Sequence, residues 1–324
     1  MRRRPALRGT AVALVLLLAG CSTPEPRFVP PPTSAPSAAT GLGQPSASPS
    51  AGPTAPPKPD VPAAAQLPLG GRTIFPKYRV VAYYGTAGNA ALGVLGESGP
   101  EAILPRLRKA SAGFATKGRP VQIAFELIVT VAQAGPGPDG DYSKMIDVAK
   151  IRSYVDAARR HKVLVVLDVQ PGRTDFLTQV KLLRPFLEQP HVGIALDPEW
   201  RMGPKQVPGK VIGAVRAAEV NAVAAYVAGI VRERNLPEKL FLLHQFRASM
   251  IPDIGAVKKR PGLAMVQHLD GFGTRAEKDA TFDRLRRPQQ FHIGYKLFYD
   301  EDVNMYAPRD VLRMRPTPAY VSYQ

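Results

Sequence analysis

Apolar runs of seven to nine residues recur along the chain from residue 79 onward, and they are rich in β-branched side chains. Short runs that are apolar almost throughout are typical of strands buried on both faces of a parallel sheet. They predict seven strands, and a shorter run predicts an eighth. The predicted strands are 79–85, 121–129, 162–169, 192–198, 239–246, 262–270, 291–299 and the short 319–323.

Helical patterns separate these strands. Six segments have apolar residues at helical spacing, and a weaker one follows the fifth strand. The predicted helices are 100–115, 147–162, 174–189, 217–235, 276–287 and 308–315, with 249–262 as the weaker candidate. Strands and helices that alternate in this way over about 250 residues predict a single-domain α/β (β/α)8 barrel of the TIM type, spanning 71–324. An open doubly wound sheet is the alternative, but no glycine-rich phosphate loop follows any strand.

Polar and aromatic residues gather at the ends of the predicted strands. They are Tyr83, Glu126, Asp168, Gln170, Asp197, Glu199, Trp200, His244, Gln245, His268, Asp270, Lys296 and Tyr299. The C-terminal ends of barrel strands form the functional face of this fold. Polar side chains on nearly every strand would be costly to bury without partners. A shared polar cleft at this end of the barrel explains all of them together.

The stretch "GIALDPEW" (193–200) carries the sharpest pair, Asp197 and Glu199. Residues two apart in a strand point to the same side. Two carboxylates so placed repel, and the one in the drier environment has its pKa raised. A carboxylic acid that stays protonated near neutrality is what a general acid for glycosidic cleavage requires. An acidic turn without catalytic function is the alternative.

The other strand-end residues admit two interpretations. In the functional one, Asp168 or Asp270 is the second catalytic carboxylate, and the remaining residues of the set bind substrate. In the structural one, Glu126 pairs with an arginine or with Lys296, the two histidines are satisfied core residues, and Asp270 caps the following "GFG" turn. The catalytic residues are expected to be Glu199, Asp197, Asp168 and Asp270.

The beginning of the chain predicts export. A basic segment (1–10) and a short apolar run (11–18) lead into Leu18-Ala19-Gly20-Cys21, which resembles the lipobox of bacterial lipoproteins. The resemblance implies a signal peptide over 1–21 and a lipid on Cys21, which would anchor the protein to the outer face of the cell membrane. Residues 22–70, rich in Pro, Ser and Ala, predict a disordered tether. Cys21 is the only cysteine, so an intramolecular disulfide is excluded.

The formal charge of the chain is +17, and most of the excess belongs to the region after the tether. A basic exported domain favours anionic envelope polymers or lipid headgroups. Nucleic acid is not an expected partner of a tethered exported protein. The expected partners are therefore the lipid bilayer, through Cys21, and a glycan.

Two resemblances add to this picture. The Asp-x-Glu at the end of the fourth strand resembles the acidic pair of chitinase-like and lysozyme-like barrels, which implies that Glu199 is the general acid and Asp197 its helper. The chitinase pattern has further aspartates upstream, where this chain has Val192 and Ala195. The lipobox, the tether and "LDPEWRM", "LHQF", "HLDGFGT" and "KLFYDED" together look like a group of surface lipoproteins of high-GC Gram-positive bacteria.

Three functions follow. The first is a glycosidase-like enzyme that acts on an envelope or environmental polysaccharide. The second is a non-catalytic glycan-binding barrel. The third is a metal-dependent hydrolase, because His244, His268, Asp270, Asp168 and Asp197 are suitable ligand types. No His-x-His occurs on the first strand and no tight ligand spacing occurs elsewhere, so neither a metal nor another cofactor is expected.

Overall fold

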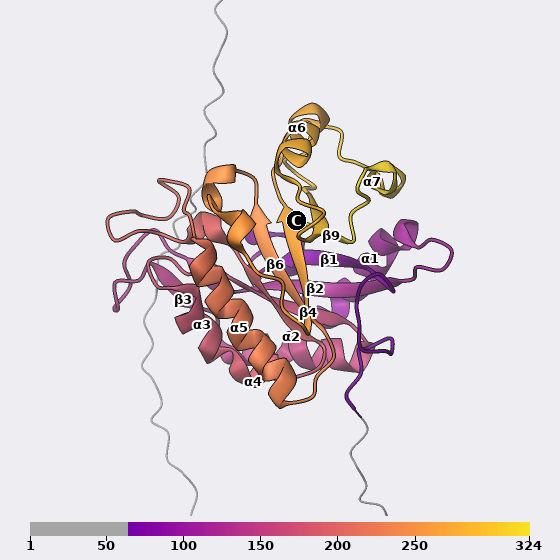
Figure 1. Cartoon of the computed structure of the whole chain (residues 1–324), viewed down its shortest axis with the longest axis horizontal. Helices are drawn as coiled ribbons and strands as arrows, with labels where there is room; N and C mark the ends of the chain where they lie inside the picture. Colours follow the sequence, from indigo (N-terminus) through magenta and orange to yellow (C-terminus); the bar gives the residue numbers. More distant parts are fainter. Residues whose placement is uncertain (1–63) are drawn as a thin grey trace, which may run out of the picture. The chain divides into compact units, whose positions relative to one another are not determined.

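Eight parallel strands close into a barrel in the computed structural model, which describes residues 64–324 (Figure 1). The strands are adjacent in the order β1, β2, β4, β5, β6, β7, β8 and β9, and β9 pairs with β1 to complete the ring. They are β1 Arg79–Gly85, β2 Val121–Ala132, β4 Leu164–Val169, β5 Val192–Leu196, β6 Lys239–Gln245, β7 Leu263–Leu269, β8 His292–Leu297 and β9 Tyr320–Tyr323. The predicted single-domain TIM-type barrel is confirmed.

Helices connect most of the strands and cover the outside of the barrel (Figure 1). They are α1 Pro100–Ser111, α2 Val148–His161, α3 Phe176–Leu182, α4 Arg184–Leu187, α5 Ala217–Glu233, α6 Arg275–Leu285 and α7 Pro308–Arg313. Local chemistry fixes several starts. The side chain of Asp147 caps α2, that of Asp175 caps α3, and Thr274 forms a capping box with Glu277 at α6.

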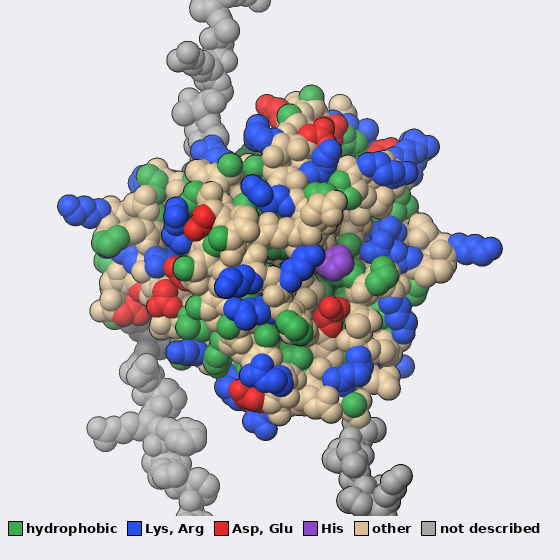
Figure 2. Space-filling model, in the orientation of Figure 1, with side chains coloured by type: hydrophobic (Ala, Val, Ile, Leu, Met, Phe, Trp, Pro, Cys, Tyr) green, Lys and Arg blue, Asp and Glu red, His purple; other side chains and the backbone are tan. Residues whose placement is uncertain are grey.

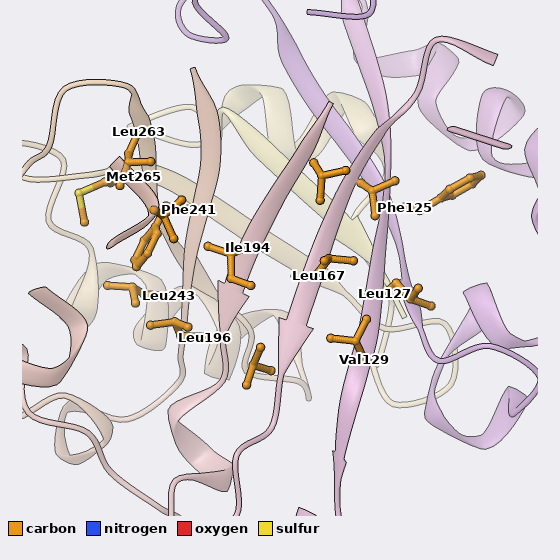
Figure 3. Close-up of a cluster of buried hydrophobic side chains, with 14 of the residues drawn as sticks. Phe125, Leu127, Val129, Leu167, Ile194, Leu196, Phe241, Leu243, Leu263 and Met265 are labelled. Carbon is orange, nitrogen blue, oxygen red and sulfur yellow. The ribbon is translucent and has the colours of Figure 1, made fainter. Parts of the chain in front are cut away.

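Two buried layers hold the barrel together, and alternation along each strand decides which layer a residue joins. One set of alternate positions, including Ala82, Val166 and Leu242, fills the barrel interior. The other set packs under the helices and includes Phe125, Leu167 and the further residues that Figure 3 labels. Both faces of each strand are apolar for this reason, which explains the continuous apolar runs in the sequence.

Two predicted helices differ from the structure. Residues 249–262 form no α-helix; they contain two single 3-10 turns, Ala248–Met250 and Ile254–Ala256. Pro252 and Gly255 interrupt the helical pattern there, because proline cannot donate the helical hydrogen bond and glycine resists being ordered. The predicted helix 174–189 is divided into α3 and α4, and Pro185 lies in the first turn of the second helix, where proline is tolerated.

One strand was not predicted. The short β3, Ser143–Met145, pairs antiparallel with the end of β2 and extends the sheet beyond the barrel. Its sequence is polar and follows a loop rich in glycine and proline, so it has no apolar alternation that could reveal it.

The segment before β1 belongs to the barrel domain. Leu67, predicted to lie in the tether, is only 4% exposed and packs with Ile74, Phe75 and Tyr78 in the interior layer, at the end where the strands begin. The predicted signal peptide, Cys21 and the tether up to residue 63 lie outside the described residues. Among residues 64–324, no helix is both long and apolar enough to cross a membrane.

Candidate functional site

The C-terminal end of the barrel holds an unusually polar interior. The inward positions of the strands carry buried polar side chains here, and Asp197 and Asp270 follow directly after β5 and β7. The inward residues are Tyr84, Glu126, Asp168, His244, His268, Lys296, Tyr320 and Ser322. We call Glu126, Asp168, Asp197, Glu199 and Asp270 the carboxylate cluster.

His244 joins two members of the carboxylate cluster. Its Nδ1 lies 2.8 Å from Asp270 Oδ2, and its Nε2 lies 2.8 Å from Glu126 Oε1. Burial alone would favour the neutral ring, but the hydrogen bonds to Asp270 and Glu126 and the charge of Asp168 raise the pKa of His244 well above its ordinary value. An imidazole whose two nitrogens both face carboxylates is an imidazolium that donates both hydrogen bonds.

The two partners of His244 are correspondingly held as anions. Burial opposes the charge of Glu126, but the hydrogen bond from His244 and the neighbouring cations lower the pKa of Glu126 to about 2. Burial opposes ionisation of Asp270 too, and again His244 prevails and lowers the pKa of Asp270. The hydroxyl of Tyr320 donates a further hydrogen bond to Glu126 Oε2 at 2.8 Å.

Asp168 lies in a different environment. Tyr84 donates a hydrogen bond to Asp168 Oδ2 at 2.9 Å, and the Lys296 ammonium lies 3.3 Å from the centre of the Tyr84 ring. That position over the ring face is a cation–π contact. Burial raises the pKa of Asp168 to about 6, and its Oδ1 has no hydrogen-bond partner among the described residues. The charge of His244, whose Nε2 lies 4.0 Å from this oxygen, opposes the rise but does not cancel it.

Asp197 and Glu199 form the acidic turn after β5. The strand ends at Leu196, so the two residues are not neighbours on a strand face as the sequence predicted; Glu199 lies in a 3-10 turn, Pro198–Trp200. Burial and then the charge of Glu199 raise the pKa of Asp197 well above its ordinary value. Burial and then the charge of Asp270 raise the pKa of Glu199 to about 7.

A close backbone approach fixes the position of this turn. The amide of Gly213 donates a hydrogen bond to the Glu199 carbonyl oxygen at 2.7 Å. A Cβ atom at position 213 would also lie 2.7 Å from that oxygen, so only glycine allows the β5–α5 loop to fold against the turn. Glu199 and Trp200 are half-buried, whereas Asp168, Asp197 and Asp270 are buried. Glu199 is therefore the acid of the cluster that solvent reaches best.

His268 has a structural position beside the cluster. Its Nε2 lies 2.7 Å from Ser322 Oγ, and burial lowers the pKa of the His268 ring to about 3, so the ring is neutral. Gly294 leaves the space that the ring needs, because a Cβ there would lie 2.5 Å from His268 Nδ1. The His268 ring lies near both Glu126 and the β8 backbone at Gly294, and as a neutral ring it adds no charge to the site.

Within residues 64–324, two groups of side chains have the spacing of metal ligands: Glu126, His244 and His268, and Asp197, His244 and Asp270. Both groups depend on His244, whose two nitrogens already donate to carboxylates. An imidazolium has no lone pair for a metal, since a ligating histidine must be neutral. A metal ion at either group would have to displace a proton of His244 and one of these two hydrogen bonds.

Several residues predicted to bind substrate lie elsewhere. Tyr83 and Tyr299 point outward under the helices, with their hydroxyls 3.2 Å apart, and Gln245 accepts a hydrogen bond from Gln267 on the outer face of β7. Alternation explains Tyr83 and Gln245, because each is next to an inward residue of its strand. Tyr299 follows the end of β8 and stacks on Tyr323 of the outer layer. Gln170 is buried at the edge of the cluster; its side chain accepts the Ala132 amide hydrogen at 3.1 Å.

Three residues of the site were absent from the predicted set. Tyr84, Tyr320 and Ser322 each contact a carboxylate or histidine of the interior. The signal that would have revealed Tyr84 was its period-two relation to Ala82 and Val80, both of which face the interior. Tyr320 and Ser322 follow the same alternation on the short last strand.

The chain was also compared with known proteins. No protein-family model matches it, and no curated protein matches it either. What the structure establishes is a TIM-type barrel with a buried carboxylate cluster at the C-terminal ends of its strands.

Proposed function

We propose that this protein is a glycoside-hydrolase-like barrel, anchored outside the cell by a lipid on Cys21, that cleaves a glycosidic bond in an envelope or environmental polysaccharide. One observation carries the proposal: neighbouring carboxyl groups at the barrel mouth have pKa values displaced in opposite directions. Glu199 is held partly protonated near neutrality and Asp270 is held ionised. Such a pair supplies the acid and the anion that glycoside hydrolysis requires.

Glu199 is the proposed general acid. It protonates the oxygen of the leaving sugar, because its raised pKa keeps a proton available near pH 7 and its half-buried position gives substrate access. Asp197, buried and with its own pKa raised, supports Glu199 as a protonated neighbour. If Asp197 were ionised, its charge would make the loss of the Glu199 proton still less favourable.

Asp270 is the proposed second carboxylate, acting at the sugar carbon either directly or through water. The hydrogen bond from His244 keeps it ionised and fixes its orientation. An oxygen of Asp197 lies within 4.8 Å of an oxygen of Asp270, so the acidic turn and this carboxylate share one small space. Asp168, steadied by Tyr84, completes the negative surroundings in which an oxocarbenium-like charge is stabilised.

A second candidate is a glycan-binding barrel without turnover. The burial of Asp168 and Asp197, which are 0% and 2% exposed, favours this reading, since a catalytic carboxylate has to meet its substrate. In that case Glu199 and Trp200 at the rim would make the sugar contacts.

The decisive experiment measures release of reducing sugar ends from a panel of purified polysaccharides. We expect the wild-type protein to act on at least one polymer, and Glu199→Gln and Asp270→Asn each to lower kcat by at least about a hundredfold, as loss of a general acid or nucleophile does. Glu233→Gln, on the outer face of α5, is the matched control and retains full activity.

The contrary outcomes are distinct. Unchanged cleavage by Glu199→Gln would remove Glu199 from the mechanism. Binding of a glycan by the wild-type protein without any product would favour the binding module. A stoichiometric metal in purified protein, lost together with activity on chelation, would establish the metal-dependent reading instead.

A further inference from the structure

The loops at the two ends of the barrel differ in charge. Eight segments lead into the strands at their N-terminal ends, and together they carry twelve Lys and Arg side chains against two Asp and Glu. The segments are 64–78, 115–120, 162–163, 188–191, 234–238, 257–262, 286–291 and 314–319. We call their cationic side chains the basic face: Arg72, Lys77, Lys117, Arg119, Lys162, Arg234, Lys258, Lys259, Arg260, Arg286, Arg287 and Arg315.

The opposite end has the opposite sign. The segments that leave the C-terminal ends of the strands carry twelve Asp and Glu against seven Lys and Arg. These segments are 86–99, 133–147, 170–175, 197–216, 246–256, 270–274 and 298–307. Among the loops, the positive excess therefore lies at the N-terminal ends of the strands, and the helices around the barrel carry a smaller positive excess of their own.

Most cations of the basic face have no carboxylate partner in the part of the chain that the structure describes. Within residues 64–324, only Arg234 and Arg286 of this set have a carboxylate within ion-pair distance, and nine of the twelve are exposed. Figure 2 shows Lys and Arg widely spread over the face that it draws, with Asp and Glu in smaller groups. Arg119 and Lys259 come from the starts of β2 and β7, yet after burial both lower the pKa of His292, so these segments adjoin.

The chain also enters the domain at this end. Leu67, Ile74 and Phe75 close the barrel interior where the strands begin. Arg72 donates hydrogen bonds to the carbonyls of Asn235 and Leu236, in the segment before β6. The first described residues of the chain therefore lie on the side of the basic face.

From these observations we infer that the basic face docks on the anionic lipid headgroups of the membrane, with the carboxylate cluster directed away from it. Near an anionic surface each Lys or Arg adds to the attraction, which decays within about one Debye length. The acidic end is repelled by the same surface, so the two ends fix one orientation. The inference uses the expected lipid anchor but does not depend on the proposed glycosidase activity.

Vesicle binding tests this inference in the full chain carrying Cys21→Ser, which removes the site of lipidation. The probes are vesicles of equal parts phosphatidylglycerol and phosphatidylcholine, with pure phosphatidylcholine as the reference for any binding by the apolar segment 11–18. We expect an excess of binding to the anionic vesicles that falls steeply with salt. The triple variant Lys117→Glu, Lys258→Glu, Arg287→Glu should lose at least about tenfold of this excess.

The matched control carries the same change of charge at the acidic end: Lys144→Glu, Lys205→Glu, Lys210→Glu. It should lower the excess by less than about threefold. Equal loss in both variants would mean that net charge, not the basic face, drives binding, and would overturn the inference. So would binding of soluble inorganic polyphosphate without binding to anionic vesicles, because the partner would then be a phosphate polymer. These outcomes test only the docking of the basic face; the proposed glycosidase activity is tested separately, by cleavage of polysaccharides.

Discussion

At the scale of single residues, the site is organised by one imidazolium ring. His244 donates to Glu126 and to Asp270 and thereby keeps two buried carboxylates ionised. The remaining acids, Asp168, Asp197 and Glu199, have no such partner, and burial raises the pKa of each. The two carboxylates whose pKa is lowered are thus those that accept a hydrogen bond from His244, and the three whose pKa is raised are those that do not.

Asp168 provides a stability test of this division. Its pKa is raised to about 6 in the folded protein, so between pH 4 and 6 the native state keeps a proton that the unfolded state releases. The free energy of unfolding therefore falls as pH rises through this window, by up to about 3 kcal/mol for this group. Asp168→Asn removes the free-energy cost of ionising this buried carboxyl group. The side-chain amide oxygen of the asparagine still accepts the hydrogen bond from Tyr84.

Asp168→Asn should raise the free energy of unfolding above that of wild type, as measured by urea denaturation. We expect this increase to be about 2 kcal/mol larger at pH 7.5 than at pH 4. The control Asp300→Asn, on an exposed loop, should shift stability by the same small amount at both pH values. A gain that does not depend on pH would show that Asp168 has an ordinary pKa.

At the scale of elements, the mouth of the barrel depends on a buried ion pair. Lys278 of α6 lies 2.8 Å from Asp302 in the loop after β8, and both side chains are almost completely buried. Asp302 also accepts the amide hydrogens of Gly273 and Phe298, one in each of the two loops that it joins. The pair therefore holds the loop that follows Asp270 in place.

Removing one partner of such a pair leaves an uncompensated buried charge. We expect Asp302→Asn to cost about 3 kcal/mol of unfolding free energy, measured by chemical denaturation. Asp283→Asn, whose partner Arg286 is at the surface, should cost less than about 1 kcal/mol. Similar costs for both variants would mean that the Lys278–Asp302 pair has no special part in the fold.

The elements also show what sequence patterns can and cannot predict. The barrel was predictable, because strands apolar on both faces alternate with helices. The strand β3 and the break between α3 and α4 were not, since β3 has no apolar alternation and Leu183 fits a continuous helix as well as a broken one. Which of the adjacent residues Tyr83 and Tyr84 faces the barrel interior depends on the register of β1. Their position at the end of the strand does not reveal that register.

At the scale of the whole molecule, the loops at the two ends of the barrel carry net charges of opposite sign. The sequence predicted the polar strand ends as a set, and the structure brings ten of the thirteen to the C-terminal end, leaving Tyr83, Tyr299 and Gln245 on the outer layer. It predicted the basic excess without its location, because the segments of the basic face are far apart in the chain. Only closure of the barrel makes them one surface.

The central claim is that Glu199 remains a protonated acid near neutrality beside an ionised Asp270. Carbon-13 NMR of protein labelled at Glu side-chain carboxyls measures this directly, and the resonance missing in Glu199→Gln identifies Glu199. We predict that this resonance titrates with a midpoint near pH 7, as the pKa of about 7 requires. A midpoint near 4.5, the ordinary pKa of a glutamate, would contradict the account.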